Sequence, residues 1–559
     1  MLTRTESLAQ LTAPGQPFEI EAAVVRGRAC RVFRNAPRTL RVIYEAARSD
    51  LPFIIYDDER LSYEETWRRT CKLTAALADE FGVRRGDRVA ISMRNYPEWM
   101  IAFCAATSLG AIAVAMNAMW QPNELEYALN DSRPTVLIVD PERLERYLRC
   151  ENAPQGIAVI ACRAQSPLPV GIHAWERVMA GHPVATMAAY DVDTDDDATI
   201  LYTSGSTGYP KGVVSSHRAI ISALLSWELD ATAAVATGLI EAPPAGDKPA
   251  MLLGVPLFHV SGSHAAFLQS FRAQRRLISM YKWDVQQGID LIERERVTAF
   301  VGTPAITGDL VDAAPKTNRD LSSLRLLGGG GSARAPKQVR DIDKRFDNAK
   351  PGTGWGMTET NAIGVGIAAK DYLDRPESSG RCSAVLDLRI VDPDGHELPT
   401  GQRGELQVRG TAVFRGYWNR PDANAETFVG GEWMRTGDVA YLDSEGFLFI
   451  VDRIKDMVIR GGENVGCGGV EAALLEHPNI VEACVYGVPD ERLGEEIGAT
   501  LYVAAPVEDH ELRDFLSSRV ARFAVPRYLH YTYEPLPRTA SGKILKRELR
   551  QEATTRLKL

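Results

Sequence analysis

The chain has 559 residues, of which 45% are hydrophobic and 25% are charged, as is ordinary for a soluble globular protein. Its formal net charge of −9 at pH 7 argues against nucleic-acid binding as the main task, because that task needs a basic surface. At roughly 150 residues per domain, the length indicates several domains, or one large domain with an appendage.

The cysteines and the N-terminus disfavour two further classes. The eight cysteines form no Cys-x-x-Cys pair and no Cys/His cluster, which argues against a zinc site. No apolar stretch follows Met1, so we expect no secretory signal and a cytoplasmic location. Residues 101–120 carry no charge, but they are rich in alanine and contain Gly110 and Asn117. We interpret them as a helix followed by a short strand, not as a transmembrane span.

In chain order, residues 1–40 show no clear period, and we expect them to be loosely attached. Ser62 and Glu65 fit a capping box that opens a helix, which Gly82 ends. Short apolar strands then alternate with helices: strands at 89–93, 111–116 and 135–139, helices at 97–108 and 123–130, and a similar texture at 218–227, 250–255 and 288–301. This alternation is typical of parallel strands joined by crossover helices.

The pattern changes twice towards the C-terminus. From about residue 385, short strands at 386–391, 404–408 and 446–451 are separated by turn residues, which indicates a small, more antiparallel β-rich subdomain. After Asp452 the strands and helices follow in an α+β style. We therefore predict an α/β protein with a large N-terminal domain (1–452) of mixed, mostly parallel sheets with flanking helices, and a small α+β C-terminal domain (453–559).

The sharpest chemical signal is a loop rich in glycine and hydroxyl groups. It contains Thr203, Ser204, Gly205, Ser206, Thr207, Gly208 and Lys211. Glycines let the backbone approach an anion closely, the N–H and hydroxyl groups donate to phosphate oxygens, and the lysine adds a positive charge. The loop is not a Walker loop, because Pro210 stands where that motif needs its Gly-Lys-Ser/Thr. The alternative is a polar loop after the strand at 198–202.

This segment resembles the phosphate loop of the adenylate-forming superfamily: acyl-CoA synthetases, luciferases and the adenylation domains of peptide synthetases. The similarity extends from about residue 50 to the C-terminus, and the other motifs occur in family order. It implies that a carboxylic acid and Mg-ATP give acyl-AMP, after which the acyl group passes to coenzyme A. It also implies one site for both steps, with a C-terminal domain that rotates between them.

Three further motifs of the large domain match nucleotide-binding motifs of that family. Gly329, Gly330 and Gly331 match backbone that lines the adenine site and borders the acyl pocket. In Gly354-Trp355-Gly356-Met357-Thr358-Glu359, the resemblance implies that Trp355 packs on adenine, that Thr358 contacts the α-phosphate and that Glu359 binds magnesium. Asp438 matches the residue that binds the ribose hydroxyls, and Arg453 a second ribose or phosphate contact.

The remaining motifs concern catalysis and domain movement. Lys543 matches the catalytic lysine, whose ammonium lowers the repulsion between carboxylate and phosphate. His259 matches a position near the substrate carboxylate, with a packed histidine as the alternative. Lys455 matches the hinge, and the loop with Gly461 and Gly462 is implied to face the nucleotide in the second step.

The chain departs from the family at one place. After Val465 the family shows an aromatic or polar residue, then proline, a small residue and glutamate, whereas this chain has Gly466-Cys467-Gly468-Gly469. These glycines loosen a segment that the resemblance places beside the thiol tunnel. This difference from the family affects the prediction of acyl transfer to the thiol and does not affect the prediction of adenylation.

The resemblance also narrows the choice of acid substrate and of the thiol that accepts the acyl group. Amino acids are disfavoured, because amino-acid-adenylating domains carry an aspartate in place of His259. The spacing from Glu359 to Asp438 leaves no room for the insertion of fatty-acyl-AMP ligases that skip coenzyme A, and no carrier domain follows Lys543. A medium- or long-chain fatty acid is the first choice. An aryl acid, a sterol side-chain acid and a carrier-protein thiol as acceptor stay open, as does the oligomeric state, a homodimer included.

Overall fold

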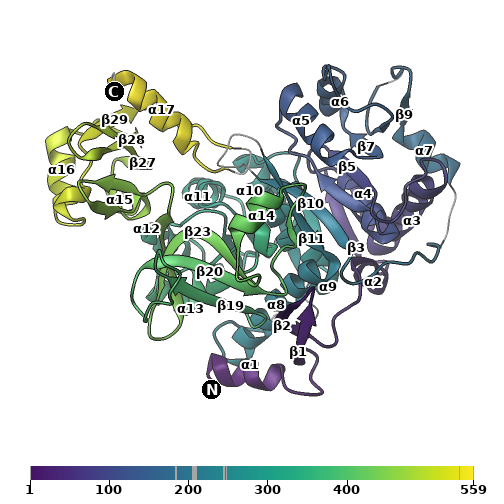
Figure 1. The fold of residues 1–559 in the computed structure, drawn as a ribbon, viewed down its shortest axis with the longest axis horizontal. Coiled ribbons are helices and arrows are strands. Elements are labelled where there is room, and N and C mark those ends of the chain that lie inside the picture. The colour runs from purple at the N-terminus through teal and green to yellow at the C-terminus, as the bar shows by residue number, and fades with distance from the viewer. Residues whose placement is uncertain are drawn as a thin grey trace.

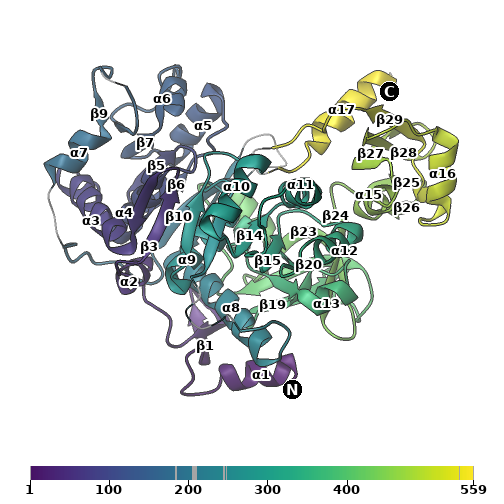
Figure 2. The ribbon, with the colours of Figure 1, turned by 180° about the vertical axis from the view of Figure 1, so that it is seen from behind.

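The computed structural model describes two bodies, a large one and a smaller C-terminal lobe (Figures 1 and 2). The described residues are 2–165, 167–182, 186–203, 210–242, 244, 246, 248–539 and 542–557. The lobe holds the yellow end of the chain, and α1 lies at the bottom of the large body (Figure 1).

The first sheet of the large body has the strand order β21-β11-β10-β6-β5-β7-β8-β9. Its parallel strands are β10 (Asp197–Thr203), β6 (Ile112–Ala115), β5 (Arg88–Ser92), β7 (Val136–Val139), β8 (Ala158–Ala161) and β9 (Ile172–Ala174). At one edge β11 (Lys211–Ser216) and β21 (Gly416–Tyr417) run antiparallel. The predicted parallel strands are thus present.

The helices of this sheet cover both of its faces, as alternation predicts. In β5, Val89 and Ile91 pack with α3 (Tyr63–Asp79) and α4 (Pro97–Leu109), whereas Ala90 packs with α5 (Pro122–Ser132). The Ser62 hydroxyl accepts from the Glu65 N–H and so opens α3. Gly110, at φ +83°, ends α4 in the left-handed conformation that glycine favours.

The second sheet has the order β19-β20-β23-β24-β18-β17-β16-β15-β14-β12-β13-β3-β4, with β4 (Glu59–Ser62) antiparallel to β3 at one edge. Its parallel part comprises β3 (Pro52–Tyr56), β12 (Ala250–Leu253), β13 (Arg276–Ser279), β14 (Ala299–Gly302), β15 (Leu326–Gly329) and β16 (Lys350–Trp355). The antiparallel part comprises β17 (Val365–Ala368), β18 (Gly380–Cys382), β19 (Leu386–Val391), β20 (Gly404–Gly410), β23 (Trp433–Leu442) and β24 (Phe447–Arg453). The predicted β-rich subdomain therefore continues the parallel sheet.

The two sheets of the large body share one core. A single cluster of buried residues joins Ile91 of the first sheet to Leu252 of the second, through Phe103 of α4 and Leu224 of α8 (His217–Ala236). Residues far apart in the sequence are thereby held in one rigid body. Strands of both sheets end at the same cleft.

The C-terminal lobe has its own sheet and core. Strands β25 (Val458–Arg460), β26 (Glu463–Val465), β27 (Ile480–Asp490), β28 (Gly494–Val503) and β29 (Tyr528–Thr532) pair with one another. Helices α15 (Cys467–Leu475), α16 (Asp509–Ser517) and α17 (Lys546–Leu557) complete it. Val485, Leu501 and Leu512 belong to a core cluster confined to this lobe. The last strand of the large sheet ends at Arg453, and the boundary at 452/453 stays a prediction.

The expectation that residues 1–40 are loosely attached is wrong for the described part of that segment. Thr3 and Glu6 form a reciprocal capping box that starts α1 (Arg4–Leu11). A hairpin of β1 (Ile20–Val25) and β2 (Arg28–Phe33) follows, with Phe33 buried in the main core. Arg4 binds Asp230 of α8 with an N–O distance of 2.9 Å. Capping and packing thus fix a segment whose sequence shows no period.

One helix among the described residues, α8, is long and apolar enough to cross a membrane by length and composition. More than half of its apolar window, 56%, is buried inside the protein, as in the core helix of a globular domain. The uncharged segment 101–120, which we interpreted as helix then strand, forms the end of α4 and then β6.

Candidate active site

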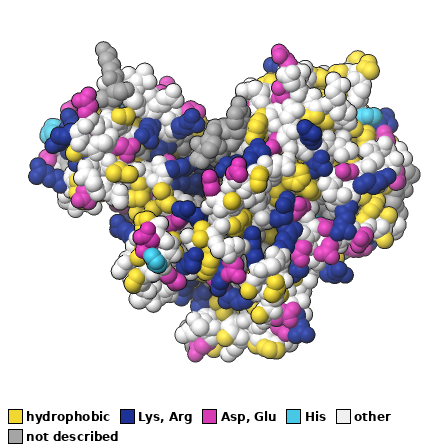
Figure 3. Space-filling view, in the orientation of Figure 1, with side chains coloured by type: hydrophobic (Ala, Val, Ile, Leu, Met, Phe, Trp, Pro, Cys, Tyr) yellow, Lys and Arg dark blue, Asp and Glu magenta, His cyan; other side chains and the backbone are white. Residues whose placement is uncertain are grey.

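A cleft of about 3590 Å³ extends between the lobe and the large body. Trp355, Glu359 and Asp438 line it from the large body, and Lys543 lines it from the lobe. Lys and Arg side chains gather where the two bodies meet (Figure 3). The predicted nucleotide residues of both domains therefore face one space.

The carboxylate of Glu359 is buried at the side of this cleft. It lies in the 3₁₀ turn Thr358–Thr360, and the Tyr417 hydroxyl donates to its Oε1 at 2.8 Å. Burial raises the pKa of Glu359, against the opposing effects of Tyr417 and Arg453. The ammonium of Lys211 lies 5.1 Å from the centre of the Tyr417 ring. Tyr417 thus links the predicted phosphate-loop lysine to the predicted metal ligand.

Asp438 forms the centre of a second group. Asp438 of β23 and Arg453 of β24 are partners in the sheet, and Arg453 Nε lies 3.2 Å from Asp438 Oδ1. The indole Nε1 of Trp355 donates to Asp438 Oδ2 at 2.7 Å. Burial raises the pKa of Asp438, while Arg453 and Trp355 oppose that rise. The three residues predicted to hold adenosine therefore contact one another.

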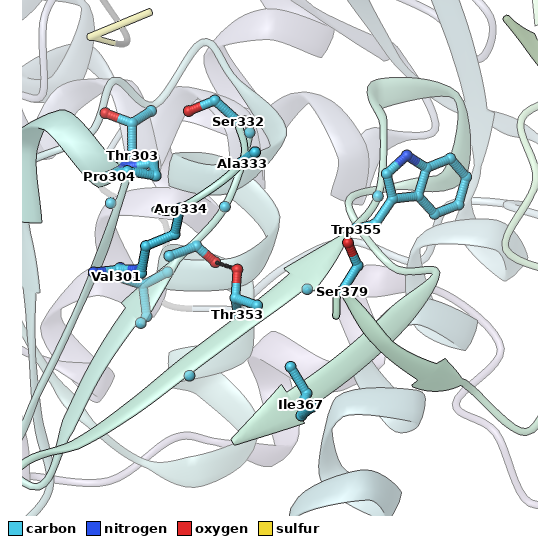
Figure 4. A pocket seen from close by; sticks show the side chains of 18 of the residues that line it. Val301, Thr303, Pro304, Ser332, Ala333, Arg334, Thr353, Trp355, Ile367 and Ser379 are labelled. Atoms are coloured by element: carbon cyan, nitrogen blue, oxygen red, sulfur yellow. Dashed lines mark hydrogen bonds between the residues drawn. The ribbon is translucent and has the colours of Figure 1, made fainter. Parts of the chain in front are cut away.

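Trp355 is also set across the pocket from the loop that follows β15. Figure 4 shows Trp355 on one side and Ser332 and Ala333 on the other, with Thr353 below the latter two. The Thr353 hydroxyl donates to the carbonyl oxygen of Gly329 at 3.3 Å. Because its indole N–H is engaged by Asp438, the Trp355 ring is held in one orientation. A flat ring held in this way is suited to stacking on a purine, which stays the prediction for Trp355.

Lys543 approaches these groups from the lobe. A Cβ placed on Gly331 would lie 3.4 Å from Lys543 Cε and 3.9 Å from its Nζ. The walls of the cleft partly desolvate Lys543, which is still exposed to solvent, and this lowers its pKa; Arg453 lowers it further, whereas Asp438 and Glu359 oppose the change. Burial, with Lys543 nearby, lowers the pKa of His259 to about 4, so this imidazole is neutral at pH 7. One cation therefore faces two buried carboxylates and a neutral histidine.

The predicted glycines are needed for several reasons. A Cβ on Gly354 would lie 2.5 Å from the carbonyl oxygen of Val365, and one on Gly356 would lie 2.4 Å from that of Ala362. Such contacts are too close for any side chain. A Cβ on Gly330 would meet nothing within 4 Å. The first two glycines therefore allow close backbone packing, and Gly330 leaves open space.

Comparison with known proteins identifies the family. The family described as AMP-binding enzyme matches residues 44–418, and its C-terminal domain matches residues 469–543. This chain belongs to the AMP-binding enzyme family. It is 34% identical to a feruloyl-CoA synthase of an Amycolatopsis species over 88% of this chain and 94% of that protein. It is 31% identical to a long-chain-fatty-acid–CoA ligase of Mycobacterium tuberculosis over 89% and 93% of the two chains.

The same fold occurs in a solved o-succinylbenzoate coenzyme A synthetase of Bacillus subtilis, in complex with ATP and magnesium ion. The TM-score is 0.76 and the identity 27%, over 92% of this chain and 99% of that one. These matches confirm the predicted superfamily and fold class. They also confirm the enzyme class, an ATP-dependent and AMP-forming acid–CoA ligase that uses ATP, Mg²⁺ and coenzyme A.

Some predicted residues of this AMP-binding enzyme lie away from the cleft. Lys455 is exposed in the turn after β24. Gly461 and Gly462, at φ +58° and +90°, form the two-residue turn between β25 and β26. Thr203 and Pro210 line the cleft, whereas Ser204, Gly205, Ser206, Thr207 and Gly208 lie outside the described residues. Roles for Lys455, Gly461 and Gly462 stay predictions.

Two residues of the cleft region were not predicted. Tyr417 reaches Glu359 because β21 pairs with β11, a contact between segments more than 200 residues apart. Arg334 lines the cleft and is buried, and its burial lowers its pKa to about 10. A charged residue three positions after a glycine run was the one available signal for Arg334, and none in the sequence pointed to Tyr417.

Proposed function

We propose that this enzyme activates an apolar carboxylic acid, with a medium- or long-chain fatty acid as first choice, and transfers it to coenzyme A in the cytoplasm. The observation that carries the adenylation step is the position of Lys543 beside Gly331, facing the buried carboxylates of Glu359 and Asp438. A cationic group there lies between the predicted sites of nucleotide and acid.

The walls of the cleft support an apolar acid. Residues from the C-terminal half of α8 and from the π-helix Ser261–Leu268 line it, with small or apolar side chains predominating: Trp227, Ala231, Ala234, Val235, Val260 and Ala265. Asp230, on the same part of α8, is already paired with Arg4 and accepts from the Ser383 hydroxyl. Among the described residues, this part of the wall therefore offers mainly apolar contact, and the carboxylate of Asp230 there is already paired.

The chemistry proposed for the residues is positioning and charge neutralisation. The ammonium of Lys543 reduces the repulsion between the acid carboxylate and the α-phosphate as they approach, and it stabilises charge in the transition state. Asp438 orients the ribose by accepting from its hydroxyl groups, and Trp355 supports the base. His259, neutral at pH 7, adds no charge beside the carboxylate. No covalent bond to the protein is required.

The carboxylate of Glu359 fits a magnesium ligand. It is an oxygen donor in a buried place, and burial raises its pKa, so a cation beside it would stabilise the charged form. The Tyr417 hydroxyl donates to its Oε1. Bound magnesium would neutralise phosphate charge. Glu359 would hold the ion, and Tyr417 would orient Glu359.

The test is release of pyrophosphate from Mg-ATP over a panel of acids, with and without coenzyme A. We expect acid-dependent release, with thioester formation only when coenzyme A is added. The highest kcat/KM is expected for fatty acids of medium or long chain. Absence of release with every acid would exclude the proposed adenylation.

An aryl acid is the second candidate. The 34% identity to a feruloyl-CoA synthase favours it, as does the indole of Trp227 in the wall of the cleft. The same panel separates the two, because an aryl-acid ligase would prefer cinnamic or benzoic acids over fatty acids of similar size.

A further inference from the structure

The junction of the two domains is bridged by one carboxylate. Asp452 lies near the end of β24 in the large body, and its Oδ2 accepts from the backbone N–H of Cys467 at 2.5 Å. Its Oδ1 accepts from the N–H of Arg453 at 2.7 Å. Cys467 is the first residue of α15 in the lobe, so the contact crosses the predicted hinge at Lys455.

Asp452 serves α15 as an N-terminal cap supplied from the other domain. The residue in the N-cap position, Gly466, has no side chain with which to cap the helix. The first N–H groups of a helix need acceptors, and a carboxylate also interacts favourably with the positive end of the helix dipole. The first helix of the lobe is therefore capped by a side chain of the large body.

The glycine-rich departure explains how the helix comes so close. A Cβ on Gly466 would lie 3.1 Å from Val451 Cγ1 and 3.2 Å from the Val451 carbonyl oxygen, and one on Gly468 would lie 3.5 Å from that oxygen. A side chain at Gly466 would press on β24, whereas one at Gly468 would make an ordinary contact with it. Cys467 in turn supplies an N–H, which a proline at this position would lack. The start of the segment Gly466–Gly469 is therefore packed tightly against β24 and is not loose. We call this contact the seam.

The seam is connected to Lys543 through short contacts within the lobe. Glu471 of α15 pairs with Lys546 of α17 at 3.0 Å, three residues beyond Lys543. At the far end of α15, Glu476 pairs with Arg340 of the large body at 2.8 Å. Both ends of α15 therefore contact the large body, and its middle holds the segment that carries Lys543.

We propose that Asp452 and the backbone N–H of Cys467 are positioning groups for adenylation, which dock the lobe so that Lys543 lies beside Gly331. The inference rests on the proposed function, because the task assigned to Lys543 is part of it. Neither group touches the reacting atoms. They act on the reaction by fixing where the lobe sits.

The test compares Cys467→Pro with Cys467→Ala. Both variants lose the thiol, but only proline removes the N–H. Proline is favoured at the first position of a helix, and Gly466 at φ −76° and ψ +118° has a backbone suited to precede it. We expect Cys467→Pro to adenylate about tenfold more slowly than Cys467→Ala, the scale of one hydrogen bond to a charged group.

The second half-reaction separates docking from general damage. Thioester formation from pre-made acyl-AMP should be equal in the two variants or faster in Cys467→Pro, because a lobe released from the seam is freer to move. Equal adenylation rates, or an equal fall of both half-reactions, would overturn the proposal. If Cys467→Pro fails to fold, Asp452→Asn tests the same bond from the acceptor side. A smaller loss confined to adenylation is then expected, and an unchanged rate would overturn the proposal.

A readout independent of activity keeps this proposal distinct from the proposed function. Trypsin cleaves after Lys455, which is exposed at the junction. Cleavage there should be faster in Cys467→Pro than in Cys467→Ala, whether or not any acid is activated. Equal cleavage would reject the docking role. A wild-type enzyme that releases no pyrophosphate would reject only the adenylation function.

Discussion

The two halves of the active site are built in opposite ways. The large body holds Trp355, Glu359 and Asp438 on strands of one sheet or in the turn that follows a strand. Trp355 is hydrogen-bonded to Asp438, and Glu359 is hydrogen-bonded to Tyr417. The lobe contributes Lys543 from a loop that reaches across the cleft, where Gly542 lies against Thr303 at the start of α11 (Pro304–Ala313).

The difference shows which part of the site can move. Groups tied into a sheet keep their relative positions, so the surface predicted to receive the nucleotide is fixed. The cation that neutralises charge depends on contacts between bodies, such as Arg340 with Glu476. A shift of the lobe therefore withdraws Lys543 without disturbing the rest. Single substitutions can test one half at a time.

The largest effect is expected from Lys543→Ala, which removes the contribution of the lobe. Adenylation should fall by about 10² or more, the scale for losing one transition-state stabiliser. Thioester formation from pre-made acyl-AMP should fall much less, if Lys543 leaves the site in that step as the family resemblance implies. Rapid-quench measurement of each half-reaction checks this, and equal losses in both would contradict the contrast between the two halves.

Glu359→Gln changes the fixed half and should lower adenylation by about 10- to 100-fold. Such a loss is typical when groups around a bound metal are altered. The amide keeps the shape and the hydrogen bond from Tyr417, so the melting temperature should stay close to wild type. Titration of the rate with Mg²⁺ should show a raised requirement. An unchanged magnesium dependence would show that this carboxylate is not the ligand.

Lys455→Pro acts on the junction and should separate the half-reactions by about tenfold. A rotation needs a few residues that absorb a large change in φ and ψ, and proline fixes φ near −65° and restricts Ile454 as well. The turn's hydrogen bonds from Asp456 and Met457 to the Arg453 carbonyl would remain. We expect acyl-AMP to accumulate because transfer to coenzyme A slows. If both rates fall together, Lys455 is not the hinge.

Tyr417→Phe should have the smallest effect, a loss of several-fold in adenylation. The change removes one hydrogen bond to the Glu359 carboxylate and leaves the ring beside Lys211 in place. The apparent affinity for Mg²⁺ should weaken while KM for the acid stays the same. A change in acid KM alone would place Tyr417 in the acid pocket instead.

Much of the fold could be predicted from the sequence, because local signals, such as a proline or glycine at the end of a helix, determine where elements begin and end. Pro97 and Gly110 bound α4 as predicted, and the strand at 386–391 has the predicted limits. Helix α1 is too short to show a hydrophobic period, and it is defined by its cap at Thr3 and by the pairing of Arg4 with Asp230. Tertiary contacts there outweigh the pattern.

The candidate site divides in the same way. Motifs predicted Glu359, Asp438 and Lys543, and the structure brings them to one cleft. The hydrogen bond from Trp355 to Asp438 and the approach of Tyr417 depend on strand pairings across long stretches of chain. The sequence likewise suggested that Gly466 loosens its segment, whereas the structure packs that glycine against Val451.

The ion pair between Arg4 of α1 and Asp230 of α8 has a practical consequence for the use of shortened forms of this protein. The family match begins at residue 44, so a shortened chain that starts there would lack Arg4 and the hairpin. Burial already raises the pKa of Asp230, and Arg4 is the larger of the two charges that oppose this, ahead of Arg381. Trimming would remove the ion pair of that carboxylate with Arg4 one residue before Ala231, which lines the cleft. The region outside the family match thus supports one wall of the cleft, and full-length protein is the appropriate material for measuring which acid it prefers.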